Sequence, residues 1–470
     1  MSPFFKLERF IPHSGRKVAV RRDPHFKVFC KIISFIKRGC NRKMIMAQEV
    51  MLFIRDVTVS GEGVGTYEGL TIFVEGALPG ERVRARIVLK KSSYAKAELL
   101  EILDGSPDRV KPICPVFGKC GGCQIMHMAY EAQLLLKRKK VVDAFLRIGK
   151  LQDFQVAQCV ASPKPLYYRN KIQLPVNENL EVGLYAKGTH NIVPIETCYI
   201  QSDAGNKILD GIELCTGLRH ILIRSNYKGE TLIVLVTREK ATEKIKALAK
   251  KISQKESVRG VLHGVNARDD NVLRSDAYTL LQGEDCIDEE VLGIKVSISP
   301  ASFFQVNLEQ AEHLYRKAFE LGCLTLNDTV LDAYSGIGVF SIYLAKQGVK
   351  VIGIEIVESA VLDAKANALK NGVSAEFLLG KVEDLIETVQ NVDVIFLNPP
   401  RKGCEEIVLQ ASIAKNPRSI IYTSCDPATL ARDLKILAGF GFTKVFAYPF
   451  DMFPQTMHVE TVVKIEKGDC

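Results

Sequence analysis

Cys425 is the residue whose type and position most directly suggest covalent chemistry. It follows a strand-like apolar run at residues 418–422 and precedes a helical pattern at residues 428–434. Backbone N–H groups and the helix dipole stabilise negative charge at a helix N-terminus, so we expect a thiolate there. Taken alone, such a cysteine is more often a structural thiol, and its neighbours must decide between these interpretations.

A second concentration of thiols occurs at residues 114–123, which contain the pattern C-x5-C-G-G-C. The glycines permit the tight backbone that wraps a soft metal. Zinc usually takes paired C-x2–4-C ligands, so this spacing favours an iron–sulfur cluster of the [4Fe-4S] type. The predicted ligands are Cys114, Cys120, Cys123 and, as the best fourth candidate, Cys198. The remaining cysteines are isolated and are most simply buried hydrophobes or spare thiols.

A candidate cofactor turn lies at residues 329–341, which read as a strand, a glycine turn and a helix. The next strand ends in Glu355, and an acid about 20 residues after such a turn can hold ribose hydroxyls. The turn has Gly336 and Gly338 but lacks the third glycine of the dinucleotide fingerprint. It resembles the S-adenosylmethionine (SAM) turn of class I methyltransferases, in which no pyrophosphate is bound.

Polar residues stand at the ends of four predicted strands in this region. They are Asp332, Glu355, Asn398 and Cys425. Ligands of parallel sheets bind at the carboxyl ends of the strands, so we expect these side chains to converge at one rim. Residues 298–470 are therefore predicted to form a Rossmann-like, doubly wound α/β domain.

The elements before this domain predict a multidomain α/β protein. A chain of 470 residues suggests about three domains. Residues 47–105 contain about five short strands with Arg and Lys on one face, which predicts a small OB-like barrel, and 74–81 resemble the core of the RNA-binding TRAM domain. Residues 106–297 alternate strands and short helices, which predicts an α+β central domain that carries the cluster.

Most of the positive charge lies at the start of the chain. The net charge is +9, and the first 45 residues contain 12 Lys and Arg against two Asp and Glu. This basic leader, residues 1–46, is an RNA-binding arm, a targeting segment or, the interpretation we favour, an extension upstream of a start at Met44 or Met46. No apolar run approaches the length of a membrane span, so we expect a cytoplasmic protein that binds no membrane.

Two further stretches admit a structural and an RNA-binding interpretation. The predicted helix at 124–150 carries a basic run, Lys137–Lys140, which is a solvated face or a set of phosphate contacts. The stretch Tyr167–Lys171 mixes aromatic and basic residues, and is equally a core strand or an RNA contact.

The motifs occur together in one order over residues 48–465. They are the TRAM-like element, C-x5-C-G-G-C, the SAM turn, N-P-P-R-K-G from Asn398, S-C-D-P-A-T-L from Ser424 and H-V-E-T from His458. Together they resemble the RNA 5-methyluridine (uracil-5) methyltransferases. Within that family, TRAM plus an iron–sulfur cluster resembles the enzyme of 23S rRNA, because tRNA-directed members typically lack both. The resemblance implies a monomer that binds 23S rRNA or its precursor.

The resemblance also implies roles for individual residues. Cys425 matches the nucleophile that adds to carbon 6 of uracil, and Glu460 matches the base that removes the carbon-5 proton. Gln305, Tyr334, Glu355 and Asn398 match positions that contact SAM. The target uridine must leave its stack, and because the chain has no Trp, Phe303 and Phe304 are candidates for stacking on it.

Two positions depart from the family pattern. The family usually has Asp where Asn398 stands, and Asp or Asn near Lys381. The first change removes a negative charge beside the reaction centre, and the second affects the expected adenine contact.

Three alternative functions remain open. The chain is a tRNA uracil-5 methyltransferase, an N-methyltransferase of adenine or guanine, or a catalytically silent RNA-binding iron–sulfur protein. Asn398-Pro399-Pro400 resembles the amino-methyltransferase motif N-P-P-[YF], but Arg401 replaces its aromatic residue and Cys425 is left without a role. The silent binder is favoured by the changes at Asn398 and Lys381.

Overall fold

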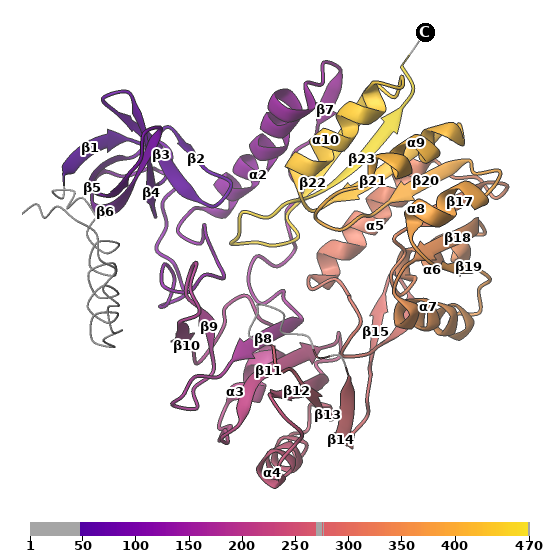
Figure 1. Ribbon diagram of the computed structural model, residues 1–470, viewed down its shortest axis with the longest axis horizontal. Helices are drawn as coiled ribbons and strands as arrows, with labels where there is room; N and C mark the ends of the chain where they lie inside the picture. The colour runs from indigo at the N-terminus through magenta and orange to yellow at the C-terminus, as the bar shows by residue number, and fades with distance from the viewer. Residues whose placement is uncertain (1–47, 269–274, 276, 469–470) are drawn as a thin grey trace, which may run out of the picture.

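The structure is a computed structural model that describes residues 48–268, 275 and 277–468 (Figure 1). The predictions for the basic leader, residues 1–46, lie outside the described residues. The part of the chain that is described forms three sheets of five or more strands. Within these ranges no helix combines the length and the apolar character that crossing a membrane requires.

The N-terminal sheet confirms the predicted β-rich unit. Its six strands lie in the order β1-β5-β6-β4-β3-β2. They are β1 (Glu49–Phe53), β2 (Asp56–Val57), β3 (Glu62–Tyr67), β4 (Leu70–Glu75), β5 (Arg82–Lys90) and β6 (Tyr94–Asp104). The outward arginines of β5 are paired across strands, since Arg84 binds Glu49 at 3.0 Å and Glu101 at 2.8 Å. Acidic neighbours therefore balance the basic face that the sequence predicts.

The central sheet has five strands in the order β14-β13-β12-β11-β8. They are β8 (Lys171–Pro175), β11 (Leu218–Ser225), β12 (Thr231–Thr237), β13 (Val258–Val265) and β14 (Tyr278–Gly283). The helices of this part are α3 (Asp203–Leu209) and α4 (Glu243–Ile252). Two small sheets have two strands each: β9 (Gly183–Tyr185) pairs with β10 (Ile192–Pro194), and β15 (Ile287–Val291) pairs with β16 (Ile294–Ile298). Tyr168 is buried and Lys171 begins β8, so part of the aromatic and basic stretch 167–171 belongs to the core.

The C-terminal sheet confirms the predicted doubly wound α/β architecture. Its eight strands lie in the order β19-β18-β17-β20-β21-β23-β22-β7. They are β17 (Thr329–Ala333), β18 (Lys350–Glu355), β19 (Glu376–Leu379), β20 (Val394–Leu397), β21 (Ser419–Ser424), β22 (Lys444–Phe450), β23 (Glu460–Glu466) and the edge strand β7 (Phe154–Val156). The helices of this part are α5 (Leu308–Gly322), α6 (Val339–Lys346), α7 (Glu358–Lys370), α8 (Val382–Leu385), α9 (Glu406–Ala414) and α10 (Pro427–Ala438). Strands β17 to β21 are parallel, whereas β23 is antiparallel to β21 and to β22.

A segment from the first third of the chain completes this sheet. Strand β7 pairs in parallel with β22, and the preceding helix α2 (Tyr130–Ala144), with its π-helical turn η1 (Phe145–Gly149), packs beside α10 (Figure 1). Phe145 and Leu151 lie in the same hydrophobic core as Leu434 of α10. The C-terminal unit thus includes residues 130–156, which the sequence places in the central domain.

The basic run of α2 is only in part the solvated face that its charges predict, since Lys139 is exposed but Lys137 is not. Lys137 is fully buried against Asp451, and Lys140 donates to a backbone carbonyl. Arg138 and Lys139 bind carbonyl oxygens and carboxylates of the same chain. All four cations are therefore engaged in contacts within the chain.

Candidate active site

One cavity of about 900 Å³ gathers the residues that the sequence singles out. It opens at the rim where the parallel strands of the C-terminal sheet end. Its lining includes all six predicted catalytic and cofactor residues: Gln305, Tyr334, Glu355, Asn398, Cys425 and Glu460. Lys381 and Arg401 line it as well. The volume is in the range of sites that hold a drug-sized ligand, and the rim is where such sheets bind theirs.

Two glycines and an acid shape the turn after β17. Gly336 and Gly338 have φ values of +57° and +79°, and Tyr334 also lies in the left-handed region at +68°. The Glu355 carboxylate accepts hydrogen bonds from the N–H of Gly336 at 3.0 Å and of Val357 at 2.9 Å. Glu355 therefore ties the turn to the end of β18 while it lines the cavity.

Asp332 lies near the end of β17 but does not line the cavity of about 900 Å³. It is buried and accepts a hydrogen bond of 2.5 Å from Ser341 Oγ of α6. Burial raises its pKa to about 7, against the opposing effect of the Ser341 bond. Its role in the resting protein is to fix α6 to β17.

The substitution Gly338→Ala should destabilise the fold by about 1–3 kcal/mol. The added Cβ would lie 2.8 Å from Phe377 and 2.9 Å from Ala364, and the backbone would remain at positive φ. Gly336→Ala is the matched control, because its Cβ meets nothing within 4 Å and only the backbone strain of about 1 kcal/mol remains. Urea unfolding of both variants checks this order, and equal losses would contradict it.

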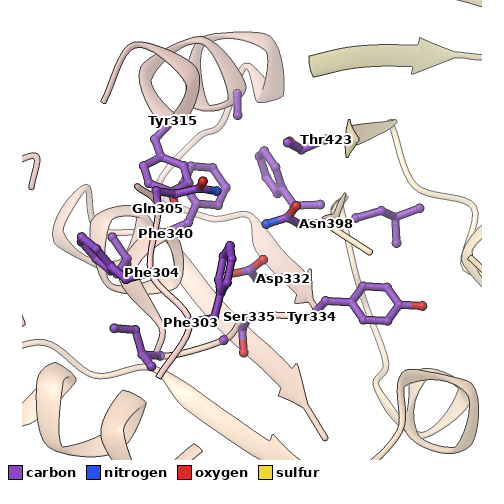
Figure 2. Close-up of a pocket in the computed structure, with 16 residues that line it drawn as sticks. Phe303, Phe304, Gln305, Tyr315, Asp332, Tyr334, Ser335, Phe340, Asn398 and Thr423 are labelled. Carbon is purple, nitrogen blue, oxygen red and sulfur yellow. The ribbon is translucent and has the colours of Figure 1, made fainter. Parts of the chain in front are cut away.

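Figure 2 shows a smaller pocket of about 70 Å³, which shares Phe303, Gln305, Tyr334 and Asn398 with the cavity of about 900 Å³. Gln305 and Asn398 approach it from opposite sides, and the Tyr334 ring points away toward Cys404, which faces its hydroxyl. Phe303 is 75% exposed at the cavity, but Phe304 is only 6% exposed and packs in the core. Of the two predicted stacking residues, the structure leaves Phe303 available and shows that Phe304 is not.

Cys425 and Glu460 face each other because β21 and β23 are antiparallel. Ser424, the last residue of β21, pairs with Thr461. One step further in the same register, Cys425 lies opposite Glu460, the first residue of β23. Since β23 runs against the parallel strands, its N-terminus reaches the rim at which those strands end. The thiol and the carboxylate therefore line one side of the cavity together.

The expectation that the helix N-terminus stabilises a Cys425 thiolate is wrong for this structure. Asp426 is the N-cap of α10, and its carboxylate already accepts the N–H groups of Ala428 at 2.8 Å and Thr429 at 3.2 Å. Burial, together with the nearby charge of Glu460, raises the pKa of Cys425 to about 11. Arg401 acts in the opposite direction on the same pKa.

Glu460 is itself buried, and this burial raises its pKa to about 7, while Arg401 lowers it. A carboxylic acid with a pKa near neutrality gains and gives up a proton readily at working pH, which suits a general base. Arg401 thus favours the charged forms of both Cys425 and Glu460.

Replacing Arg401 by Gln should shift the pH–rate profile of the protein to higher pH. Loss of the guanidinium removes the charge that lowers both pKa values, so the deprotonated forms appear only at higher pH. Turnover measured between pH 6 and 9 should fall most at the acid end. Arg401→Lys keeps a positive charge and should shift the profile less; an unshifted profile in Arg401→Gln would refute the assignment.

Two cavity residues have no role in the sequence prediction. Phe453 and His458 lie on the segment between β22 and β23 and line the cavity beside Cys425. Burial lowers the pKa of His458 to about 4, so its imidazole is neutral at pH 7. The segment carries no helical or strand period, and the H-V-E-T motif was the one signal that could have pointed to it.

The structure also brings the four predicted cluster cysteines into one another's electrostatic range. Burial raises the pKa of Cys120, Cys123 and Cys198, and the charges of the neighbouring thiols raise it further. Cys114, Cys123 and Cys198 pack on one apolar cluster with Tyr168.

This group does not have the arrangement of a single-metal site. Throughout the described ranges, no set of three or more His, Cys, Asp or Glu side chains is arranged to hold a metal ion. A tetrahedral ion with bonds of about 2.3 Å requires sulfurs in near contact. The arrangement of the described residues therefore does not itself support the predicted iron–sulfur cluster, which rests on the spacing of the cysteines in the sequence.

Comparison with known protein families gives two matches. Residues 130–468 match the family described as tRNA (Uracil-5-)-methyltransferase, and residues 48–100 match the TRAM domain. The second match confirms the predicted TRAM unit. The first spans the segment 130–156 as well as the whole C-terminal sheet.

Individual relatives agree with these matches. An uncharacterized RNA methyltransferase of Clostridium acetobutylicum is 38% identical over 445 residues, 89% of this chain and 97% of the relative. One from Halalkalibacterium halodurans is 39% identical over 442 residues, 89% of this chain and 96% of the relative. The crystal structure of Pyrococcus abyssi tRNA (uracil-54, C5)-methyltransferase with S-adenosyl-L-homocysteine has a TM-score of 0.71 and 28% identity, and covers 88% of this chain and 100% of that one.

Proposed function

Because the chain belongs to the tRNA (uracil-5-)-methyltransferase family, a family of SAM-dependent RNA methyltransferases, we propose that it methylates carbon 5 of a uridine in RNA. The observation that carries this proposal is the opposition of Cys425 and Glu460 at a cavity shared with the glycine turn. An N-methyltransferase would need neither residue. Uracil-5 chemistry needs a nucleophile and a base on the same side of the site.

The reaction proceeds in three steps on this proposal. The Cys425 thiolate forms a bond to carbon 6, and the electrons of the C5–C6 double bond move into an enolate. Carbon 5 then takes the methyl group that bound SAM supplies from its sulfonium, leaving S-adenosylhomocysteine. Glu460 finally removes the carbon-5 proton, the double bond re-forms and the C6–S bond breaks to release the thiolate.

The positions around the turn supply the cofactor site in this scheme. Glu355, which already fixes the turn, is proposed to hold ribose hydroxyls. Gln305, Tyr334 and Asn398 line the same cavity and are proposed to contact the cofactor. Lys381 lines the same cavity where the family has an acid or amide, so we assign it no adenine contact.

The RNA substrate is proposed to be 23S rRNA or its precursor. The TRAM domain supports an RNA substrate, and its combination with the thiol group resembles the rRNA enzyme. A tRNA substrate is the second candidate, favoured by the likeness to the Pyrococcus abyssi tRNA enzyme. Mapping 5-methyluridine in both RNAs from cells with and without the gene separates the two: loss from tRNA alone would refute the rRNA proposal.

We further propose that the four thiols hold an iron–sulfur cluster. Its ligands would be Cys114, Cys120, Cys123 and Cys198. The cluster would have a structural or RNA-positioning role, because methyl transfer requires no redox step. A brown protein with visible absorbance, lost in Cys120→Ser or Cys198→Ser, would support this. A colourless, zinc-loaded protein would refute it.

The proposed domains keep their predicted order. They are the TRAM barrel at 47–105, the thiol-bearing central domain at 106–297 and the methyltransferase domain at 298–470, with the 130–156 segment packed onto the last.

The test of the reaction uses labelled SAM and RNA that contains 5-fluorouridine. Fluorine at carbon 5 cannot leave as a proton does, so the enzyme should remain covalently attached to methylated RNA. Methyl transfer to adenine or guanine would support the N-methyltransferase alternative instead. Absence of any transfer to rRNA or tRNA would support the silent RNA binder.

A further inference from the structure

The nine residues before the proposed base, 451–459, are held in place by a distant helix. They join β22 to β23 and form no helix or strand, although all of them are described. They carry Phe453 and His458 into the cavity and end at Glu460. The position of Glu460 therefore depends on contacts that residues 451–459 make with other elements.

One face of α2 supplies many of these contacts. Gln133, Lys137 and Lys140 are separated by four and three residues, so they project from one side of the helix. Lys137 Nζ binds the Asp451 carboxylate and donates to Phe453 O at 3.0 Å.

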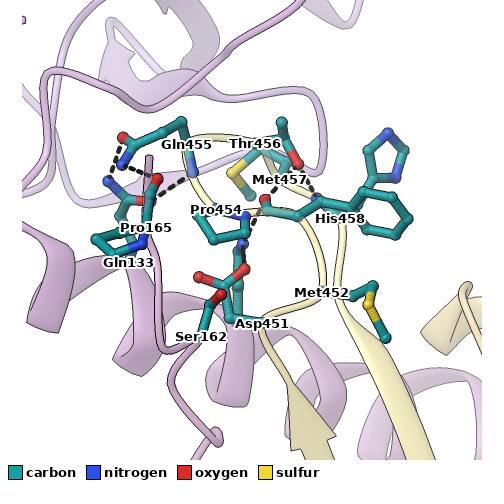
Figure 3. Close-up of polar contacts among 12 residues, drawn as sticks. Gln133, Ser162, Pro165, Asp451, Met452, Pro454, Gln455, Thr456, Met457 and His458 are labelled. Carbon is teal, nitrogen blue, oxygen red and sulfur yellow. Dashed lines mark hydrogen bonds and ion pairs between the residues drawn. The ribbon is translucent and has the colours of Figure 1, made fainter. Parts of the chain in front are cut away.

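The other two residues of this face hold the later part of the segment, and Figure 3 shows the contacts of Gln133 with Gln455. Lys140 Nζ donates to Met457 O at 2.9 Å. Gln133 and Gln455 form a reciprocal pair, in which Gln133 Nε2 donates to Gln455 Oε1 and Gln455 N donates to Gln133 Oε1, both at 3.0 Å. Gln455 has a φ of +71°, a strained conformation that these bonds fix.

The ion pair at the centre of this contact lies in the protein interior. The side chains of Lys137 and Asp451 are both fully buried. Two desolvated charges gain little net stability over apolar residues of similar volume, but they tolerate only a narrow geometry, since either one alone would be buried and uncompensated. An ion pair of this kind suits a role in fixing one arrangement of the chain.

We propose that Gln133, Lys137 and Lys140 are positioning residues for the proton-abstraction step, acting through residues 451–459 on Glu460. This inference rests on the proposed function, in which Glu460 acts only after methyl transfer. The other proposed site residues lie on other elements: Cys425 follows β21, Glu355 ends β18 and Gln305 precedes α5. Weakening the α2 contacts should therefore slow release of the product more than formation of the methylated adduct.

The test compares Lys140→Met and Gln133→Leu with the matched control Lys139→Met in the full-length protein. Lys139 is on the same helix, is exposed and pairs with Asp56 and Asp143. Single-turnover methyl transfer to a uridine-containing RNA, the steady-state rate and the covalent protein–RNA adduct are measured. Lys137→Met is left out of the decisive set because an uncompensated Asp451 threatens folding.

The positioning role predicts a split between these readouts. Single-turnover methyl transfer should stay within about two-fold of the parent, while the steady-state rate falls about ten-fold or more and methylated adduct accumulates. Lys140→Arg keeps the donor and should restore turnover, and Lys139→Met should match the parent. Two results would overturn the proposal and leave a simple structural contact. One is an equal loss of single-turnover methyl transfer and of the steady-state rate without accumulation of adduct, and the other is no loss of either.

A reference variant separates this proposal from the proposed function. If Glu460→Gln accumulates adduct and the α2 variants do not, positioning by α2 is refuted and the uracil mechanism stands. If Glu460→Gln itself accumulates none, the assignment of the base is refuted, and the α2 proposal falls with it.

Discussion

Replacing Cys425 by Ala should lower methyl transfer by at least about 10⁴-fold and abolish the covalent complex with 5-fluorouridine RNA. Carbon 5 of uracil is a poor nucleophile until a thiolate has added to carbon 6, so no bypass remains. SAM binding should survive, because the glycine turn and Glu355 are on other strands. The measurement is transfer of label from SAM to RNA, with SAM affinity determined in parallel.

The control for this variant is Cys323→Ala, which removes an exposed thiol at the end of α5. It should leave both transfer and complex formation unchanged. A complex that persists in Cys425→Ala would show that a different group attacks the base. Loss of SAM affinity in Cys425→Ala would show instead that the substitution disturbs the cofactor site.

The second large effect is expected for Glu460→Gln, which should lower steady-state turnover by about 10³-fold. The amide keeps the shape of the side chain but cannot accept the carbon-5 proton. Thiolate addition and methyl transfer precede this step, so about one methyl group per enzyme molecule should still be transferred and remain attached to the protein. Gel mobility under denaturing conditions and label on the protein–RNA adduct measure this.

A conservative change further along the same strand provides the comparison. Glu466→Gln lies near the far end of β23, where Glu466 pairs with Lys464, and it should turn over normally. Rapid release of methylated RNA from Glu460→Gln would mean that another group takes the proton. His458 would then be the next candidate, since its neutral imidazole lines the same cavity.

The sequence predicted the rim of the site because local signals mark strand ends. Glycines after β17, an acid at the end of β18 and the turn after β21 each identify one strand end, and parallel pairing brings these ends together. Cys425 was found in the same way at the end of β21, whereas Glu460, the first residue of β23, was identified through the resemblance of its H-V-E-T motif to the uracil-5 methyltransferases. These predictions needed no knowledge of contacts between distant parts of the chain.

The features that the sequence did not reveal depend on long-range contacts. Lys137 looked like part of a solvated basic face, but its partner Asp451 is 314 positions away. The pKa of Cys425 was expected to be low because the sequence indicates a helix N-terminus beside it. The sequence does not indicate that Asp426 already caps this helix or that the thiol is buried. Phe303 and Phe304 are adjacent in sequence, and only packing decides which one is exposed.

The strand β7 has a consequence for how the chain acquires its structure during synthesis. Its partner β22 and the Lys137 partner Asp451 are translated about 290 to 310 residues later, so helix α2 leaves the ribosome long before its docking surface exists. Contacts of such separation close large loops, and they slow folding. The C-terminal sheet consequently cannot mature as an independent late domain, and a fragment that starts at residue 298 would lack an edge strand and leave Asp451 without its cation. Completion of the active site is thereby tied to completion of the entire chain.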